Sequence, residues 1–211
     1  DIVRSRTYQL ATAHDEANFA ADPTNDLLWR MRPRRLQAEA LRDTLLMVGG
    51  ELELEPLHGS PMQKVGYNQL APNHLKQIRE SAQKRHRSVY LAVLRSQDTD
   101  ELLRVFDFPE PSLSLGKREV TTVPLQSLYL MNSDLVLETA DALAGRLTGD
   151  ESMSDAQRVV RVHRLLLPRR PTQGETDRAL RFLTHSEGAP ADRWAAYVQA
   201  LLMSAEFQYL Y

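Results

Sequence analysis

The sequence predicts a mainly α-helical domain, irregular and rich in long loops in its first half and closing with an antiparallel helical bundle at its C-terminus. Apolar residues recur at helical spacing in one segment of the first half and through most of the second half. Residues that commonly begin and end helices flank these segments. We expect residues 1–211 to form a single domain with two subregions, an arginine-rich front half (1–110) and a helical bundle (111–211).

The composition is that of a folded protein without a preference for polyanions. Of the 211 residues, 42% are hydrophobic and 26% are charged, which excludes a largely disordered chain. The formal net charge of -2 creates no field that would attract nucleic acid, so we expect no nucleic-acid partner. No apolar run approaches the roughly 20 residues that span a bilayer, so the sequence predicts no membrane span.

The sequence predicts neither a cofactor nor a metal in this chain. It has no cysteine, which excludes disulfides, thiolate nucleophiles, iron–sulfur clusters and a CxxCH haem attachment. His14 lies beside Asp15 and Glu16, but no third ligand follows at a helical or hairpin spacing. A solvated turn is therefore the preferred interpretation of these three residues.

The first 33 residues carry few regular signals. Residues 1–21 have no sustained period, and we expect Tyr8, Leu10 and Phe19 to lay an extended segment over the core. The sequence Asp-Pro-Thr-Asn at 22–25 then predicts a turn and the start of a helix.

The clearest helix of the first half begins near Arg34 and ends at Gly49-Gly50. Its apolar positions are Leu36, Ala40, Leu41, Leu45 and Val48. The arginines that crowd its start are Arg30, Arg32, Arg34 and Arg35. Positive charge at this end opposes the helix dipole, so these side chains need acidic partners or a ligand. We favour structural ion pairs over an anion site.

The rest of the first half is harder to assign. Residues 51–83 alternate turn-forming residues with isolated apolar ones, which predicts a long loop. The run SVYLAVLR at 88–95 is compatible with a buried strand and with a short core helix. Thr99 is expected to cap a short helix that ends before Pro109.

Residues 106–133 form an irregular polar stretch, and helices follow it to the C-terminus. Ser133 or Asp134 begins the first of them, and Gly149 follows it. The next two begin at capping boxes, Ser154 with Gln157 and Thr172 with Glu175. The last carries Trp194 toward Phe207. Short loops between such amphipathic helices predict an antiparallel bundle, in which His163 is interpreted as a core histidine rather than a ligand.

Several strings then stand in a recognisable order: PRRLQAEALRDTLL, RSVYLAVLR, FDFPEPS, TTVPLQSLYLMNS, LLLPRRPTQGE and WAAYVQALLMSAEF. Over nearly its whole length the chain resembles the planctomycete secreted domain family, the domain of unknown function numbered 1553. It is similar to the larger, C-terminal share of such a domain, and TTVPLQSLYLMN is the most specific segment. One departure is that many relatives have a cysteine shortly before Arg118, where this chain reads SLSLGKR.

The resemblance implies context more than chemistry. Members are large exported proteins, which implies a periplasmic or cell-surface location and other domains of the same polypeptide as partners. Many carry a cytochrome-c-like domain, so any haem would lie on another domain. Some contain carbohydrate-binding-like modules, which makes polysaccharide a further candidate partner. The family's polar motif positions fall on Arg35, Glu39, Arg42, Asp43, Arg87, Asp107, Arg118, Thr121, Thr122, Gln126 and Asn132.

Two segments supply most of these candidate site residues. Arg35, Glu39 and Arg42 follow an i, i+4, i+7 spacing and would line one face of the first-half helix. Residues 118–126 precede or enter a helix, where free backbone amides would hold an anion or a carboxylate.

If the two segments pack together, Glu39 or Asp43 with Asp107 would form a carboxylate pair of the kind that cleaves glycosidic bonds. The alternative is that these residues cap helices and form salt bridges that fix an irregular loop onto the bundle. We favour this alternative because structural ion-pair networks are commoner than active sites.

The leading hypothesis is therefore a helical accessory or interaction domain of an exported multidomain protein, without chemistry of its own. The runner-up is a carbohydrate-active enzyme domain that uses the paired carboxylates. A deep cleft with two carboxylates of raised pKa would favour the enzyme, and a filled, ion-paired surface would favour the interaction domain.

Overall fold

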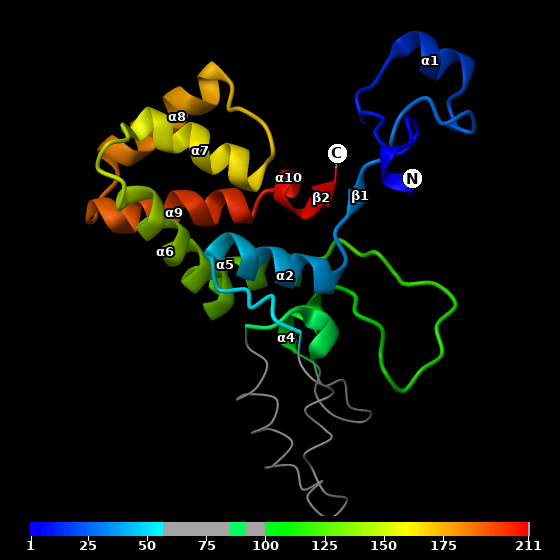
Figure 1. The fold of residues 1–211 in the computed structure, drawn as a ribbon, viewed down its shortest axis with the longest axis horizontal. Helices are drawn as coiled ribbons and strands as arrows, with labels where there is room; N and C mark the ends of the chain where they lie inside the picture. Colours follow the sequence, from blue (N-terminus) through cyan, green and yellow to red (C-terminus); the bar gives the residue numbers. More distant parts are fainter. Residues whose placement is uncertain (57–84, 92–99, 211) are drawn as a thin grey trace, which may run out of the picture.

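The fold is mainly helical, as the sequence predicts. A computed structural model describes residues 1–56, 85–91 and 100–210 (Figure 1). Their buried apolar side chains form one core, to which both halves of the chain contribute. The strands among these residues are β1 (Arg34–Arg35) and β2 (Tyr209–Leu210), which pair antiparallel and bring the C-terminus next to the start of α2. None of the described helices is long and apolar enough to cross a membrane.

Helix α2 (Ala38–Gly49) is the predicted first-half helix, and it begins later than Arg34. Leu41 and Leu45 on its inner face are fully buried. Gly50 ends it with a φ of 79°, a left-handed conformation that favours glycine. Because Arg35 lies in β1 rather than in α2, the predicted i, i+4, i+7 row of charges on one helix is wrong for this residue.

The second half contains the expected succession of helices. These are α5 (Pro124–Asn132), α6 (Asp134–Thr148), α7 (Asp155–Leu166), α8 (Gln173–His185), α9 (Pro190–Leu202) and α10 (Ala205–Gln208). Helix α6 packs along α9 and also contacts α2, while α7 and α8 pack together (Figure 1). The last predicted helix is divided into α9 and α10, because Ser204 caps a new turn by accepting a hydrogen bond from the Phe207 N–H.

Both predicted capping boxes are confirmed. The Ser154 hydroxyl accepts from the Gln157 N–H at 3.4 Å, and the Gln157 amide oxygen accepts from the Ser154 N–H at 2.8 Å. Thr172 and Glu175 exchange the same two bonds at 3.3 and 2.7 Å. Each box satisfies amides that the first turn of a helix leaves free, which fixes where α7 and α8 begin.

Two predictions for the first 33 residues are wrong. Tyr8 and Phe19 are exposed, and residues 16–21 form helix α1 (Glu16–Ala21), capped by Asp15, instead of an extended segment over the core. The turn at 22–25 is present but starts no helix. The Asp22 carboxylate there accepts from the backbone N–H groups of Asp26 and Leu27, which holds the chain in a non-helical loop.

The segment at 88–95 is neither of the two expected elements in its described part. Ser88–Tyr90 forms a short 3-10 helix, η4, in which Ser88 is buried and Val89 is 73% exposed. Residues 92–95 lie outside the described residues, as do Thr99 and most of the predicted loop at 51–83. The short helix expected before Pro109 is α4 (Glu101–Val105), and Asp100 is its N-cap.

Candidate functional site

The polar stretch between α4 and α5 closes on itself through Asp107. The Asp107 carboxylate accepts hydrogen bonds from the backbone N–H of Thr121 at 2.8 Å and from the Thr121 hydroxyl at 2.7 Å. Asp107 has a φ of 63°, a left-handed conformation that Asp and Asn adopt more readily than most residues. The residue therefore both turns the chain and binds the far end of the turn.

The buried side chain of Gln126 completes this closure at the start of α5. Its Nε2 donates to the Val105 carbonyl at 3.1 Å, and its Oε1 accepts from the Val123 N–H at 3.2 Å. The amides expected to hold an anion are thus partly used within the protein, since Asp107 binds that of Thr121 and Gln126 binds that of Val123.

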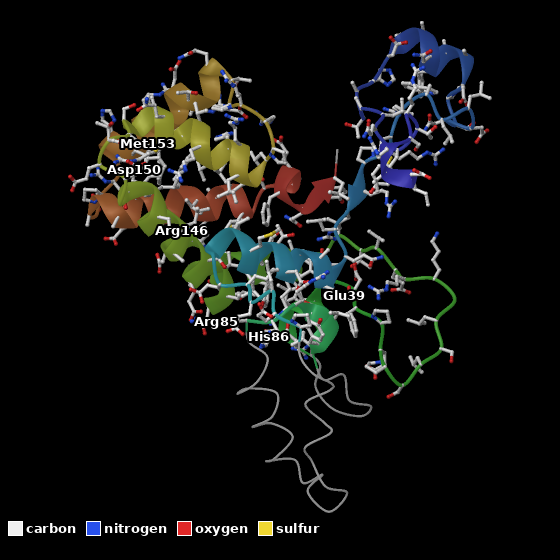
Figure 2. All side chains as sticks on the ribbon, viewed as in Figure 1. Glu39, Arg85, His86, Arg146, Asp150 and Met153 are labelled. Atoms are coloured by element: carbon white, nitrogen blue, oxygen red, sulfur yellow. The ribbon has the colours of Figure 1, made fainter. Side chains whose placement is uncertain are left out.

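Arg118 joins the same stretch to the start of α2. Its Nη1 donates to Glu39 Oε2 at 2.8 Å and to Gln37 Oε1 at 3.3 Å, and Figure 2 shows Glu39 in the first turn of α2. Partial burial raises the pKa of Glu39, but the hydrogen bond from Arg118 and its positive charge outweigh burial, so the net shift is downward. Glu39 is therefore held ionised.

Arg35 ties together three parts of the chain. From β1 it donates to the Thr121 carbonyl and, at 3.1 Å, to Gln208 Oε1 in α10. Its guanidinium lies 5.2 Å from the centre of the Phe106 ring. Arg32 likewise donates to the Thr24 carbonyl. The acceptors of these two arginines are neutral groups rather than the expected carboxylates.

Asp43 belongs to a second cluster, between α2 and residues 85–91. Its Oδ1 accepts from both the N–H and the hydroxyl of Ser88 at 2.7 Å, and its Oδ2 lies 3.5 Å from Arg87 Nε. Arg42 is only 4% exposed and donates to the His86 carbonyl at 2.9 Å and to the Ser88 hydroxyl at 3.3 Å. Burial lowers the pKa of Arg42, opposed by the nearby carboxylates. Figure 2 shows His86 beside α2.

The structure thus brings the two predicted segments together, but not into a cleft. Arg35, Asp107 and Arg118 line a cavity of about 50 Å³ between the start of α2 and the loop before α5. Glu39 reaches this region only through its ion pair with Arg118. Asp43 lies in the other cluster, bound by Ser88.

The remaining predicted residues lie outside both clusters. Thr122 is exposed, and Asn132 donates to the Leu128 carbonyl one turn back in α5 at 2.8 Å. His163 is a core residue, as predicted, with Nε2 2.9 Å from the Tyr197 hydroxyl. His14 lies 3.2 Å from Glu16, and the described residues hold no cluster of three or more His, Asp or Glu side chains suited to a metal.

Sequence reasoning missed three residues of these contacts. The run 88–95 predicts that Ser88 lies in a strand or a helix. The signal for its contacts is that its hydroxyl directly follows the basic residues 84–87. Gln37 and Gln208 carry no signal, since amide side chains are common on surfaces. A further network joins Arg169 to Glu175 and Glu206, and the capping box at Glu175 gave a partial signal for it.

Comparison with models of protein families gives a match that covers most of the chain. The family model described as "PSD1: Protein of unknown function (DUF1553)" matches residues 1–183. No curated protein and no solved structure matches the chain.

Proposed function

The chain belongs to the PSD1 family of proteins of unknown function, and we propose that it is a helical interaction domain of an exported multidomain protein, with no reaction of its own. The observation that carries this proposal is that Glu39, Asp43 and Asp107 are each bound by donors of the same domain. A structural role for these carboxylates accounts for their positions without a substrate.

The geometry around the carboxylates supports the proposal that they have a structural role. A general acid for glycosidic bonds needs a raised pKa, whereas the pKa of Glu39 is lowered by Arg118. The cavity beside Asp107, about 50 Å³, is well below the roughly 300–1,000 Å³ of typical ligand sites. The polar residues instead hold the loop before α5 against α2.

An exposed apolar face of α5 is the surface through which we expect the domain to bind its partner. Leu125, Leu128 and Met131 are 58%, 53% and 50% exposed and lie three residues apart on one side of the helix. Gln126 and Leu130 are buried on the opposite side, so α5 packs on the core through one face and presents apolar side chains on the other. Contiguous exposed apolar side chains commonly mark interaction surfaces. We assign this face to a neighbouring domain of the same polypeptide.

The absence of catalysis is tested with the full-length protein and a panel of polysaccharides. Binding and release of reducing ends are measured for the unmodified protein and for Glu39→Gln, Asp43→Asn and Asp107→Asn, with Glu138→Gln on the exposed side of α6 as the control. We expect the first three changes to lower the melting temperature. We expect neither the unmodified protein nor any variant to release reducing ends. Cleavage that disappears in Glu39→Gln or Asp107→Asn, with the fold intact, would establish the enzyme.

The docking face is tested by photo-crosslinking in the full-length protein. Benzoylphenylalanine replaces Leu128 in one sample and Phe182, a half-exposed residue of α8, in the other. We expect position 128 to crosslink to another domain of the polypeptide and position 182 not to do so. Equal crosslinking from the two positions would contradict a specific docking surface on α5.

A further inference from the structure

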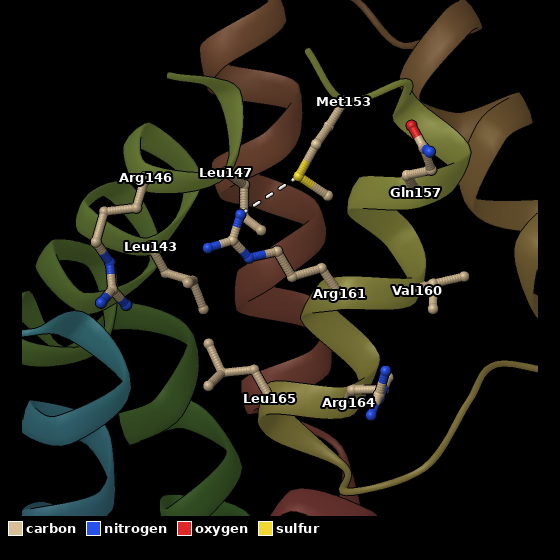
Figure 3. A pocket seen from close by; sticks show the side chains of 9 residues that line it. All are labelled: Leu143, Arg146, Leu147, Met153, Gln157, Val160, Arg161, Arg164 and Leu165. Atoms are coloured by element: carbon tan, nitrogen blue, oxygen red, sulfur yellow. Dashed lines mark hydrogen bonds between the residues drawn. The ribbon is translucent and has the colours of Figure 1, made fainter. Parts of the chain in front are cut away.

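A groove runs between α6 and α7, on helices that take no part in the polar clusters. It has a cavity volume of about 610 Å³ (Figure 3). Its lining residues are Leu143, Arg146, Leu147, Met153, Gln157, Val160, Arg161, Arg164 and Leu165. Leu143 and Leu147 are buried and form its floor, whereas Leu165 is 47% exposed.

The groove exists because α7 uses its main apolar face elsewhere. Val159, Val162 and Leu166 are buried in the core, and α7 packs chiefly against α8. The side of α7 that is turned away from the core carries Val160 and Leu165, which both line the groove; Leu165 points toward α6, whereas Val160 points away from it (Figure 3). Apolar side chains on this second side of the helix are left partly open to solvent.

The charge of the groove is positive. Three of its nine lining residues are arginines and none is acidic, within the part of the chain that the structure describes. Arg146 donates to the Val48 carbonyl, a neutral acceptor. Arg161 lies 3.6 Å from Asp150 at one end of the groove and contacts Met153 Sδ at 3.3 Å, with its side chain 54% exposed. Such a surface favours an anionic partner.

The arginines are spread along the groove rather than gathered at one point. Figure 3 shows Arg146 on the α6 side, Arg161 reaching over the middle, and Arg164 farther along α7. A small amphiphile with one anionic headgroup would meet a single arginine. A helix with an apolar stripe flanked by several carboxylates would place leucine side chains on the floor and carboxylates against separate guanidinium groups.

We propose that the α6–α7 groove binds an acidic amphipathic helix of a partner protein. Two observations place this helix outside this chain: the charge of residues 57–84 and the burial of the apolar faces of α6, α8 and α9. Residues 57–84 carry Lys64, Lys76, Arg79 and Lys84 against the single acid Glu80, so this segment has the wrong sign. The helices α6, α8 and α9 already bury their apolar faces in the core.

The test uses the full-length protein and a designed 16-residue peptide with leucine at a helical spacing and glutamate on both flanks. Controls are a scrambled peptide of the same composition, the same helix with lysine for glutamate, and laurate as a small anionic amphiphile. Fluorescence anisotropy is expected to show binding of the acidic helix in the range of about 10–100 µM, weakening as salt is raised. Lack of binding, or equal binding of the scrambled peptide, would overturn the proposal. So would displacement of the peptide by laurate at equal concentration.

Variants locate the site. Arg161→Gln with Arg164→Gln is expected to weaken binding of the acidic helix about tenfold, and Leu165→Glu to abolish it, whereas Arg181→Gln on exposed α8 leaves it unchanged. Arg161→Glu with Arg164→Glu is expected to reverse the preference toward the lysine peptide. Because these side chains are at least partly exposed, the fold should survive, which thermal melting checks. Unchanged affinity in the charge-reversed protein would refute binding in this groove.

Discussion

Thr121 donates two hydrogen bonds to Asp107, one from its backbone N–H at 2.8 Å and one from its hydroxyl at 2.7 Å. The two residues lie 14 positions apart, at opposite ends of the loop that separates α4 from α5. Arg35 then binds the Thr121 carbonyl, so a single residue of the loop connects to Asp107 and to the strand before α2. This contact explains how an irregular stretch keeps one conformation against the bundle.

Asp107→Ala is expected to destabilise the domain by about 2–3 kcal/mol, because it removes both acceptors and places alanine at a left-handed φ. Asp107→Asn tolerates that φ and should cost less. Thr121→Val should cost about 1 kcal/mol. Urea unfolding of Asp107→Ala, Thr121→Val and the variant with both changes measures the coupling energy between the two side chains, which is expected to be about 1 kcal/mol. Strict additivity of the single effects would show that the two side chains do not interact.

Ser88→Ala is expected to destabilise the domain by about 1–3 kcal/mol, because the buried hydroxyl binds Asp43 at 2.7 Å and also contacts Arg42. Val89→Ala is the matched control, since Val89 is mostly exposed and its truncation should stay within about 0.5 kcal/mol. Chemical unfolding at neutral pH compares the two. Similar losses in both variants would mean that residues 85–91 are held by something other than Ser88.

The buried His163 is expected to make stability depend on pH. Burial lowers the pKa of His163 below its ordinary value of about 6.5, with Glu175, Arg169 and Glu206 contributing smaller and partly cancelling effects. Below pH 6.5 the unfolded chain therefore binds a proton that the folded chain does not, and stability falls as pH falls, by at most about 1.4 kcal/mol per unit. His163→Gln keeps a group for Tyr197 but does not titrate.

Urea unfolding between pH 7.5 and 5 measures this dependence, in a range above the unfolded pKa values of Asp and Glu. The unmodified protein should lose stability toward pH 5 and His163→Gln should lose less. Tyr197→Phe should lower stability at every pH while keeping the slope. Parallel curves for the unmodified protein and His163→Gln would show that His163 is not the titrating group.

Arg169→Met is expected to destabilise the domain by about 1–2 kcal/mol. Its guanidinium binds Glu175 at 2.7 and 2.9 Å and Glu206 at 2.5 and 2.8 Å, which joins α8 to α10. Its hydrogen bonds lower the pKa of Glu175 strongly. Arg170→Met is the control, because Arg170 is the next residue along the chain and its side chain is exposed. Thermal melts in low and high salt should show a loss for Arg169→Met that shrinks as salt rises, and a loss of equal size for Arg170→Met would contradict the network.

Alanine at two glycines should have opposite effects. Gly50 has a φ of 79°, and an added Cβ would lie 3.0 Å from Arg146 Nη1, so Gly50→Ala should cost about 1–2 kcal/mol. Gly145 is an exposed position within α6 with open space around an added Cβ, so Gly145→Ala should stabilise by up to about 1 kcal/mol. Differential scanning calorimetry checks both, and a Gly50→Ala protein as stable as the unmodified one would contradict the strain.

The helical class follows from the amino-acid sequence alone, because helix formation depends on signals within a few residues. The capping boxes at Ser154 and Thr172 and the apolar period of α2 are local and were predicted correctly. The turn signal at 22–25 predicts a helix start that does not form, because the Asp22 carboxylate accepts from the following backbone N–H groups in a loop as readily as in a helix cap.

The contacts of the polar candidate residues depend on how distant parts of the chain pack together. Arg35 meets Gln208 across 173 positions and Arg118 meets Glu39 across 79, separations at which sequence spacing carries no information about contact. The groove between α6 and α7 cannot be predicted from the sequence either. Arg161 and Leu165 have the pattern of ordinary surface residues, and it is the packing of α7 on α8 that orients them toward α6. Local free-energy preferences determine where the helices form. Burial and charge pairing between distant elements determine which side chains meet and which surfaces result.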